Sequence, residues 1–343
     1  MLVTRQPVLR RFWYPVMKVA QLDDGPQAFT LLGENIVLWR SATGELSCLK
    51  DRCCHRTAKL SLGFIETAGL VCGYHGWTYR ADGVCVRIPQ RQNPENVSDR
   101  VRVPAYRVRE RYGYVWVALD EPLTGIPEFP EAALPAFRQV DQFYEPWAIG
   151  AFRLMENSFD ASHVAFVHRK TFGNVERPRT DGHRDLRQGD YGFDAVNETP
   201  VKVRGELAHK AVHTEGGETV RRTLSTWYMP FVRRAAIHYP HGLIHVIVTC
   251  ATPMTDRSSM ILQWAYRNDT EAEVSTAEVI AFDRAITLED KRILESCEPD
   301  VPLADSDGEE MHMNTDLPGV VMRRMFAKLL AAHGETEQRL IPS

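Results

Sequence analysis

The sequence predicts an α+β protein with two domains: an N-terminal domain of short β-strands over residues 1–120, and a C-terminal domain over residues 121–343 in which helices accompany an antiparallel sheet. A length of 343 residues is more than twice the roughly 150 expected of one domain. The two parts are separated by a stretch where four prolines fall within fourteen residues and regular structure cannot persist: Pro122, Pro127, Pro130 and Pro135.

The N-terminal domain is predicted from short apolar runs that alternate with glycines and charged turns. The clearest runs are residues 36–39, 46–49, 70–71 and 112–119. Because each run is short and bounded by turn residues, we expect strands of a compact β domain.

The C-terminal domain begins with residues 152–166, which have helical character. Strand-like segments follow and predict an antiparallel sheet: residues 201–203, 219–228, 235–239, 244–250 and 260–266. Two more helices are expected, one over residues 276–297 and one that opens at Pro318 and runs to Ala332.

Composition excludes several classes of protein. Hydrophobic residues make up 44% and charged residues 25% of the chain, as in an ordinary globular protein. The net charge of −4 gives no basic field for nucleic acid. The longest apolar stretch, residues 243–254, is too short to span a membrane. The N-terminus lacks the pattern of a secretory signal, so we expect a cytoplasmic protein.

Two short motifs each combine one cysteine with one histidine. Cys53 and His55 form C-x-H, and after sixteen residues Cys72 and His75 form C-x2-H. A Rieske [2Fe–2S] cluster has two cysteines on one iron and two histidines on the other, so two such half-sites predict this cluster. A structural zinc site is the lesser alternative, because zinc fingers usually pair cysteine with cysteine and histidine with histidine.

A second motif, N-x2-D-x2-H-x4-H, runs from Asn157 through Asp160 and His163 to His168. On a helix the first three residues share a face. His168 would be turned by about 140° from His163, so both imidazoles can reach one metal only if the helix ends or loosens near Val167. Taken singly, each histidine is more typical of a hydrogen-bonded core residue; the joint pattern favours a metal site.

Two histidines need a third ligand, and the facial triad of non-haem iron(II) sites uses a carboxylate. The helix over residues 276–297 carries an apolar stripe: Val279, Phe282, Ile286, Ile293 and Cys297. Asp290 lies about 40° from this stripe, and Glu289 lies about 60° from it on the other side. Because a carboxylate on a core-facing stripe costs several kcal/mol unless it is paired or metal-bound, Asp290 is the predicted ligand.

Both motifs together resemble the oxygenase component of the Rieske non-haem iron oxygenases, a ring-hydroxylating and demethylating family. The resemblance covers nearly the whole chain and is carried by FWYPV at 12–16, DRCCHRTAKLSLG at 51–63, CGYHGW at 72–77, RYG at 111–113 with Trp116, the Asn157 to His168 motif, and LEDKRILES at 288–296. The small homotrimeric members look most similar: methylxanthine N-demethylases, vanillate and dicamba O-demethylases, and saxitoxin-pathway hydroxylases. Cys54 is a departure, because the family usually has proline there; we expect it to alter only loop stiffness or cluster potential.

The resemblance implies a fold and a set of metal ligands. The fold would be an N-terminal Rieske β domain and a C-terminal helix-grip (START-like) catalytic domain. The cluster would be held by Cys53, His55, Cys72 and His75, and a mononuclear Fe(II) by His163, His168 and Asp290. Asp160 would link the cluster histidine of one subunit to the iron histidine of its neighbour, and Asn157 would orient a ligand or close a coordination position.

The implied activity is that of a monooxygenase or demethylase. Dioxygen and electrons, which come from NAD(P)H through a ferredoxin or flavin reductase, would hydroxylate or N- or O-demethylate a small cyclic or heterocyclic compound. A larger ring system such as a pigment is the alternative substrate. Two alternatives from other classes are a Rieske electron carrier without a substrate and a lipid-binding helix-grip module without catalysis.

Basic residues surround the cluster motifs: Lys50, Arg52, Arg56, Lys59, Arg80 and Arg87. They suggest a docking surface for an acidic electron donor. An ordinary solvated surface explains them equally well, so both interpretations stay open.

Overall fold

The computed structural model describes residues 1–180, 182–214, 217–304 and 310–340, which fold into two compact units. One unit is Leu9–Ile126, and the other combines Met1–Val8 with Pro127–Ser343. The junction at Ile126 falls inside the proline-rich stretch, shortly after the predicted boundary at residue 120. The first eight residues join the C-terminal unit, as the bond from the Thr4 hydroxyl to Asp256 (2.7 Å) illustrates.

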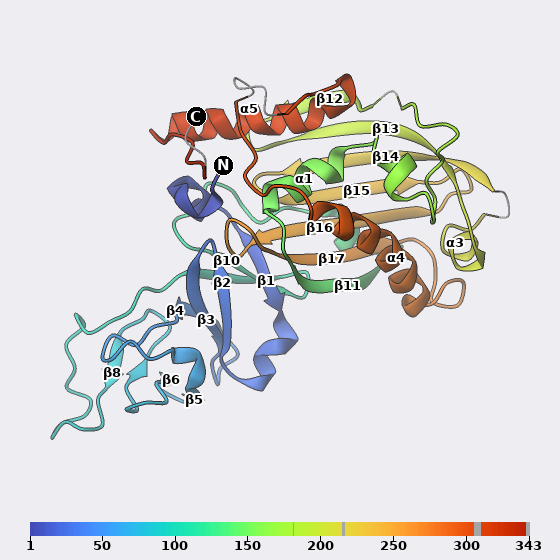
Figure 1. Ribbon diagram of the computed structural model, residues 1–343. Helices are drawn as coiled ribbons and strands as arrows, with labels where there is room; N and C mark the ends of the chain where they lie inside the picture. Colours follow the sequence, from blue (N-terminus) through green and yellow to red (C-terminus); the bar gives the residue numbers. More distant parts are fainter. Residues whose placement is uncertain (181, 215–216, 305–309, 341–343) are drawn as a thin grey trace. The chain divides into compact units, whose positions relative to one another are not determined.

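The Leu9–Ile126 unit consists of three small antiparallel sheets, in the orders β1-β10-β9, β2-β3-β4 and β5-β6-β7-β8 (Figure 1). The strands are β1 (Tyr14–Lys18), β2 (Gln27–Leu31), β3 (Glu34–Arg40), β4 (Leu46–Lys50), β5 (Phe64–Glu66), β6 (Gly69–Val71), β7 (Thr78–Tyr79), β8 (Cys85–Arg87), β9 (Arg107–Arg111) and β10 (Tyr114–Ala118). The predicted strands in this region are confirmed as β3, β4, β6 and β10.

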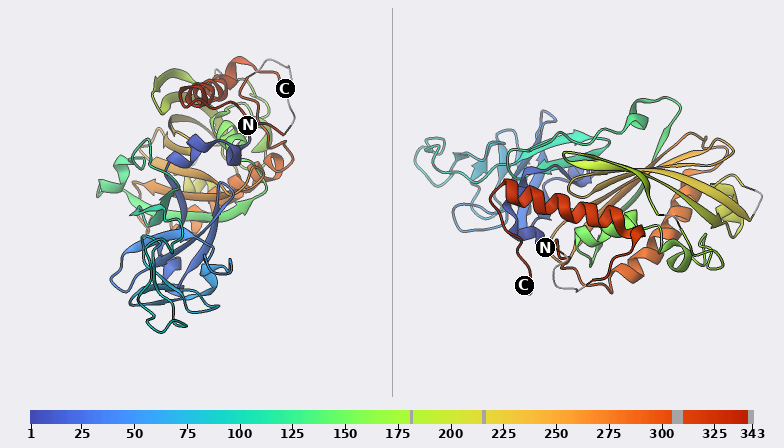
Figure 2. Two further views of the ribbon diagram at one scale, coloured as in Figure 1. Left: turned by 90° about the vertical axis from the view of Figure 1, so that its left-hand side faces the viewer. Right: turned by 90° about the horizontal axis from the view of Figure 1, so that it is seen from above.

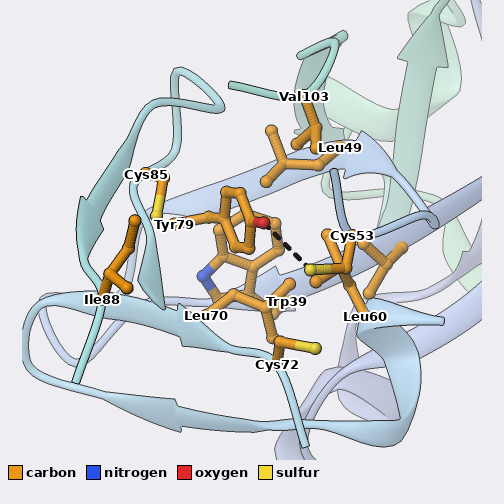
Figure 3. Close-up of a cluster of buried hydrophobic side chains, with 11 residues drawn as sticks. Trp39, Leu49, Cys53, Leu60, Leu70, Cys72, Tyr79, Cys85, Ile88 and Val103 are labelled. Atoms are coloured by element: carbon orange, nitrogen blue, oxygen red, sulfur yellow. Dashed lines mark hydrogen bonds between the residues drawn. The ribbon is translucent and has the colours of Figure 1, made fainter. Parts of the chain in front are cut away.

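A buried apolar cluster forms the core between the β2-β3-β4 sheet and the β5-β6-β7-β8 sheet (Figure 3). Trp39, Leu49 and Tyr79 are at most 1% exposed, and Cys53 and Cys72 lie among them. Since burial of such side chains contributes about 1.5–3 kcal/mol each, this core fixes the loops that carry the two cysteines.

A seven-stranded antiparallel sheet, counted over the described residues, forms the C-terminal unit in the order β11-β17-β16-β15-β14-β13-β12. The strands are β11 (Arg138–Trp147), β12 (Arg184–Gly189), β13 (Gly192–Lys202), β14 (Glu218–Tyr228), β15 (Val232–His238), β16 (Ile244–Pro253) and β17 (Ser259–Arg267). The predicted sheet is confirmed, but β11, β12 and most of β13 were not expected. β11 is an edge strand with mostly polar residues and Pro146, which is tolerated at an edge.

Helices α1 and α4 cover one face of this sheet, and α5 packs against α1 (Figures 1 and 2). The helices are α1 (Ala151–Phe159), α2 (Val164–Val167), α3 (Glu206–Ala211), α4 (Thr276–Leu294) and α5 (Leu317–Ala332). Short 3₁₀ turns are η1 (Val3–Arg5), η2 (Pro7–Arg11), η3 (Val19–Asp24), η4 (Leu60–Leu62), η5 (Pro130–Ala133) and η6 (Asn314–Asp316). Within the described ranges, no helix has the length and apolar character that crossing a bilayer requires.

The predicted helix over residues 152–166 is wrong in one respect, because it is interrupted at Asp160. This residue is extended (φ −83°, ψ 120°), and its Oδ1 accepts the N–H of Ser162 at 2.6 Å. A short acidic side chain that bonds to the nearby backbone competes with helical hydrogen bonds. The expected ending at Val167 is confirmed.

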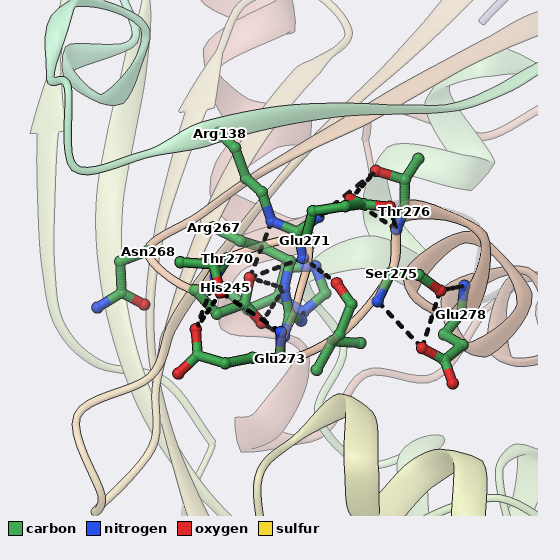
Figure 4. Close-up of polar contacts among 12 residues, drawn as sticks. Arg138, His245, Arg267, Asn268, Thr270, Glu271, Glu273, Ser275, Thr276 and Glu278 are labelled. Atoms are coloured by element: carbon green, nitrogen blue, oxygen red, sulfur yellow. Dashed lines mark hydrogen bonds and ion pairs between the residues drawn. The ribbon is translucent and has the colours of Figure 1, made fainter.

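A polar network anchors the start of α4 to the sheet (Figure 4). Arg138 of β11 donates to Asp269 (2.9 Å), which also accepts two bonds of 3.1 Å from Arg267 of β17. Ser275 and Glu278 form a capping box at the first turn. Because α4 carries the predicted metal ligand, this network fixes the position of the site.

Replacement of Arg267 should destabilise this anchor. The side chain of Arg267 is fully buried, and Arg267→Met leaves Asp269 with Arg138 as its remaining arginine partner and His213 at 3.2 Å. We expect unfolding free energy to fall by about 3 kcal/mol in chemical denaturation. Arg257→Met, at an exposed arginine, is the control and should change stability by less than about 0.5 kcal/mol. Equal effects of both substitutions would contradict the assigned role.

Candidate metal centres and the cavity beside them

The two cysteine–histidine loops share one backbone conformation. In each loop, the cysteine N–H donates to the carbonyl five residues ahead, and the cysteine carbonyl accepts the N–H four residues ahead, at 2.8–3.0 Å. The residue at that fourth position has a positive φ in both loops, 59° at Thr57 and 70° at Gly76. The repeated geometry presents one cysteine and one histidine from each loop.

The side chains of these loops are arranged in like pairs. Cys53 and Cys72 are buried and interact directly, while the rings of His55 and His75 lie with centroids 4.5 Å apart. Nδ1 of His55 is buried and has no hydrogen-bond partner among the described residues. Paired thiols beside paired imidazoles match the ligand set of a [2Fe–2S] cluster with one all-cysteine and one all-histidine iron.

Several groups are directed at the cysteine sulfurs. The hydroxyl of Tyr79 lies 3.0 Å from Sγ of Cys53 (Figure 3). The same hydroxyl lies 3.2 Å from Sγ of Cys54. Burial raises the pKa of Cys72, whereas backbone N–H groups of Tyr74 and His75 lower it. Such donors stabilise negative charge on sulfur and tune a cluster's reduction potential.

His163, His168 and Asp290 come together in the C-terminal unit. Nε2 of His163 and Nε2 of His168 each lie 3.4 Å from Oδ1 of Asp290. This is the spacing expected for ligand atoms bound at about 2.1 Å to one ion. No other group of three such side chains in the described ranges converges this closely.

A carboxylate also lies behind each imidazole. Nδ1 of His168 is 3.0 Å from Glu289, and Nδ1 of His163 is 3.4 Å from Asp160. Partners at Nδ1 fix the orientation and tautomer of a histidine and leave Nε2 for a metal. The sequence did not predict the contact between Glu289 and His168, because the two residues lie 121 positions apart.

The turn after α2 fixes His168. Its carbonyl accepts the N–H groups of Thr171, Phe172 and Gly173 at 2.7–3.0 Å. A Cβ at Gly173 would lie 2.3 Å from the carbonyl oxygen of Val164, so only glycine fits. The Phe172 ring stacks on the imidazole at 4.8 Å.

The electrostatics of the three side chains suit a bound cation. Burial lowers the pKa of His168 to about 3, and the positive charges of His163 and Arg221 act in the same direction, so the ring is neutral. Burial raises the pKa of Asp290. The positive charge of His163 and the hydrogen bond from the Asn157 amide, 3.4 Å from Oδ1, act in the opposite direction. A divalent metal would compensate this buried carboxylate.

The predicted apolar stripe of α4 is buried only in its first half. Val279 and Phe282 are buried, but Ile293 is 49% exposed and Cys297 is also exposed, so the predicted extension of the stripe to residue 297 is wrong. In the same half of the helix Leu294 is buried, and both Asp290 and Leu294 line a cavity.

This cavity has a volume of about 170 Å³ and lies between the sheet, α1, α2 and α4. Its wall includes all of the residues from the second motif, Asn157, Asp160, His163 and His168, as well as Asp290. It also includes polar residues that the sequence did not single out: His183, Arg221, Arg233, His245 and Asp283. A small molecule in the cavity would lie beside the predicted metal ligands His163, His168 and Asp290.

Comparison with protein-family models gives two matches. Residues 12–107 match the Rieske [2Fe-2S] domain, and residues 151–332 match the vanillate O-demethylase oxygenase C-terminal domain. The second match covers more than half of the chain and contains His163, His168 and Asp290.

Individual proteins match along almost the whole length. Methylxanthine N1-demethylase NdmA of Pseudomonas putida is 30% identical over 343 residues, covering 96% of this chain and 92% of that protein. The structure of Pseudomonas putida NdmA with caffeine superposes with a TM-score of 0.83 at 28% identity, covering 98% and 97% of the two chains. Dicamba monooxygenase, at 23% identity and a TM-score of 0.81, shares the fold.

The two domain matches and the nearly full-length relative establish the family. Both also agree with the architecture described above, an N-terminal β unit and a C-terminal unit with a large antiparallel sheet. The chain therefore belongs to the Rieske non-haem iron oxygenases, which are oxidoreductases that combine a [2Fe–2S] cluster with a mononuclear iron and use dioxygen as cosubstrate.

Proposed function

We propose that this protein hydroxylates, or removes an N- or O-methyl group from, a small cyclic or heterocyclic compound. The observation that carries the proposal is the convergence of His163, His168 and Asp290 on one point at the wall of a cavity. The likeness to a methylxanthine N-demethylase over 96% of the chain supports the choice of reaction.

Each centre has a distinct set of ligands in this proposal. Cys53, Cys72, His55 and His75 hold the cluster, and His163, His168 and Asp290 hold the mononuclear iron. The cluster supplies electrons one at a time, and ferrous iron supplies dioxygen activation.

The remaining polar residues position these ligands. Glu289 and Asp160 hold the imidazoles of His168 and His163, respectively, from behind. Asn157 orients the Asp290 carboxylate through the hydrogen bond to its Oδ1. Apolar side chains of α4, Phe282, Ile286 and Leu294, line the cavity beside these ligands.

The overall reaction balances with one dioxygen, two electrons and two protons per turnover. One oxygen atom enters a C–H bond of the substrate, and the other leaves as water. If the C–H bond belongs to an N- or O-methyl group, the hydroxymethyl product loses formaldehyde. The electrons come from NAD(P)H through a separate ferredoxin or flavin reductase.

The alternatives have less support. A simple electron carrier would leave the three converging ligands and the cavity without a purpose, and a lipid-binding module would not need the cluster loops. A pigment substrate is supported by the match to pheophorbide a oxygenase from Oryza sativa, which covers 55% of this chain but 39% of that protein. A homotrimer and a cytoplasmic location stay predictions from the sequence.

The metal assignment predicts the iron content of ligand variants. The parent enzyme should contain about three irons per chain, and His168→Ala should contain about two, with the visible spectrum of the cluster unchanged. Oxygen uptake and formaldehyde release from methylated heterocycles, measured with a surrogate reductase, should disappear in this variant. His241→Ala, at an exposed histidine, is the control. Stoichiometric zinc in the parent protein, or three irons in His168→Ala, would refute the assignment.

Asp160 is proposed to lie on the route of electrons from a cluster to the mononuclear iron. Asp160→Asn keeps an acceptor for the Ser162 N–H, so both metal sites should stay filled. In a single turnover with dioxygen and substrate, reoxidation of the reduced cluster should slow by about a hundredfold or more, which corresponds to about 2.7 kcal/mol. Glu289→Gln removes the matching carboxylate behind His168 and should weaken iron binding. Once this variant is fully loaded with iron, its cluster should be reoxidised much faster than the cluster of Asp160→Asn. Equal rates in both variants would exclude Asp160 from the route.

The surface beside the cluster loops has the composition of a protein interface. Leu62, Phe64 and Tyr74 are 78%, 50% and 66% exposed. Exposed apolar side chains grouped in this way mark contact sites. Arg52, Arg56 and Lys59 are also exposed here, and within the described residues none of them forms an ion pair. We propose that an acidic electron donor docks on this surface.

Docking by charge predicts a salt-dependent rate of cluster reduction. The rate should fall as ionic strength rises, because screening weakens attraction between exposed charges. Arg56→Gln together with Lys59→Gln should lower the rate at low salt and flatten its salt dependence. Arg257→Gln, on the C-terminal unit, changes one exposed charge elsewhere and serves as the control. A rate that does not respond to salt would favour the interpretation as an ordinary solvated surface.

A further inference from the structure

Two arginines in the cavity wall have no carboxylate partner. Arg221 of β14 and Arg233 of β15 both line the cavity, and within the part of the chain that the structure describes neither forms an ion pair. Buried or partly buried cations are normally paired, because an unpaired charge away from water is costly. Unpaired arginines in a cavity therefore point to a ligand that supplies the opposite charge.

Arg221 is the less satisfied of the two. Its guanidinium packs over the Phe172 ring at 4.9 Å, and its buried Nε has no hydrogen-bond partner among the described residues. Arg233 lies over Phe159 at 5.2 Å and donates to Ser225 at 3.1 Å, although its Nε is also buried without a partner. Burial and the positive charge of Arg221 together lower the pKa of Arg233 to about 9, against the opposing effect of Asp290.

The carboxylates of the cavity wall are engaged by other groups. Asp283 lies 3.1 Å from Nε2 of His245. Asp290 faces the two metal-binding imidazoles, and Asp160 lies behind one of them. With these three carboxylates and two arginines, the wall would carry a net positive charge once a divalent iron is bound and the histidines are neutral.

The wall between the arginines is apolar. Along the paired strands β14 and β15, Arg221 precedes Thr223, which pairs with Ile237, while Arg233 pairs with Trp227 at the other end. Ile237 therefore lies between the two arginines in register, and Phe282 and Ile286 of α4 line the same cavity. An apolar wall with a cation at its edge fits a flat ring that bears an anionic group.

We propose that the substrate is a ring compound with a carboxylate, or an oxyanion of the same charge, which binds to the guanidinium of Arg221 while the ring lies along Ile237 and α4. Arginine suits this role because its planar guanidinium forms two parallel hydrogen bonds with a carboxylate. Arg233 adds a second positive charge at the other end of the wall. This inference rests on the proposed function, since it defines the substrate class of the same cavity.

The test measures ligand binding and does not need turnover. The three methoxybenzoate isomers, the matching methoxybenzamides and the matching methoxybenzenesulfonates are titrated into anaerobic, iron-loaded enzyme by calorimetry. We expect at least one anion to bind about thirtyfold more tightly than the amide of the same shape. Comparison of carboxylates with sulfonates identifies the preferred oxyanion.

Variants locate the binding group. Arg221→Gln should reduce the ratio of anion to amide affinity to nearly one. Arg222→Gln is the matched control, because Arg222 is the next residue of β14, is exposed, and faces away from the cavity. Arg221→Lys keeps the charge but loses the planar group, so its ratio should lie between those of Arg221→Gln and the parent. Thermal unfolding and iron content verify that each variant is folded and loaded.

The outcomes separate this inference from the proposed function. Amides that bind as tightly as anions, a failure of every anion to bind, or an unchanged ratio in both Arg221 variants would overturn the inference. Selectivity that survives in Arg221→Gln but is lost in His168→Ala would assign anion binding to the metal and would also overturn it. In contrast, absence of the mononuclear iron from the parent enzyme would defeat the proposed function itself.

Discussion

The contact between the turn around α2 and the C-terminal half of α4 is the interaction on which the candidate metal site depends. Two adjacent carboxylates of α4 contact both nitrogens of one imidazole: Glu289 lies at Nδ1 of His168, and Asp290 lies near Nε2. The turn can present His168 in this way only because Gly173 allows close approach of the chain to itself. The same arrangement recurs at His163, with Asp160 in the position of Glu289.

The anchoring of α4 extends this constraint to the whole C-terminal unit. Its first turn is capped by Ser275 and Glu278 and is fixed to the sheet through the buried pair of Arg267 and Asp269. Because a helix is stiff, fixing one end determines the position of Asp290 four turns later. The unit therefore uses a buried ion pair at the first turn of α4 to position the predicted metal ligand, Asp290, in the C-terminal half of the same helix.

Different kinds of contact hold the two candidate metal centres in place. The cluster loops are short, each closes through its own backbone hydrogen bonds, and a small apolar core fixes them. The candidate mononuclear site instead joins segments more than a hundred residues apart, and the cavity beside it is lined by Arg221 and Arg233. Local hydrogen bonds therefore fix the cluster loops, whereas the packing of distant segments fixes the candidate mononuclear site.

The sequence by itself determined what depends on neighbouring residues. The spacing of Cys53, His55, Cys72 and His75 is a property of two short loops, and the position of Asp290 follows from the period of one helix. Only the tertiary structure decided which distant groups meet: the interruption of the helix at Asp160, the pairing of Glu289 with His168, the edge strand β11, and the approach of Arg221 and Arg233 to one cavity. Periodicity describes the faces of one element, but the pairing of side chains from different elements is set by how the sheet and helices pack.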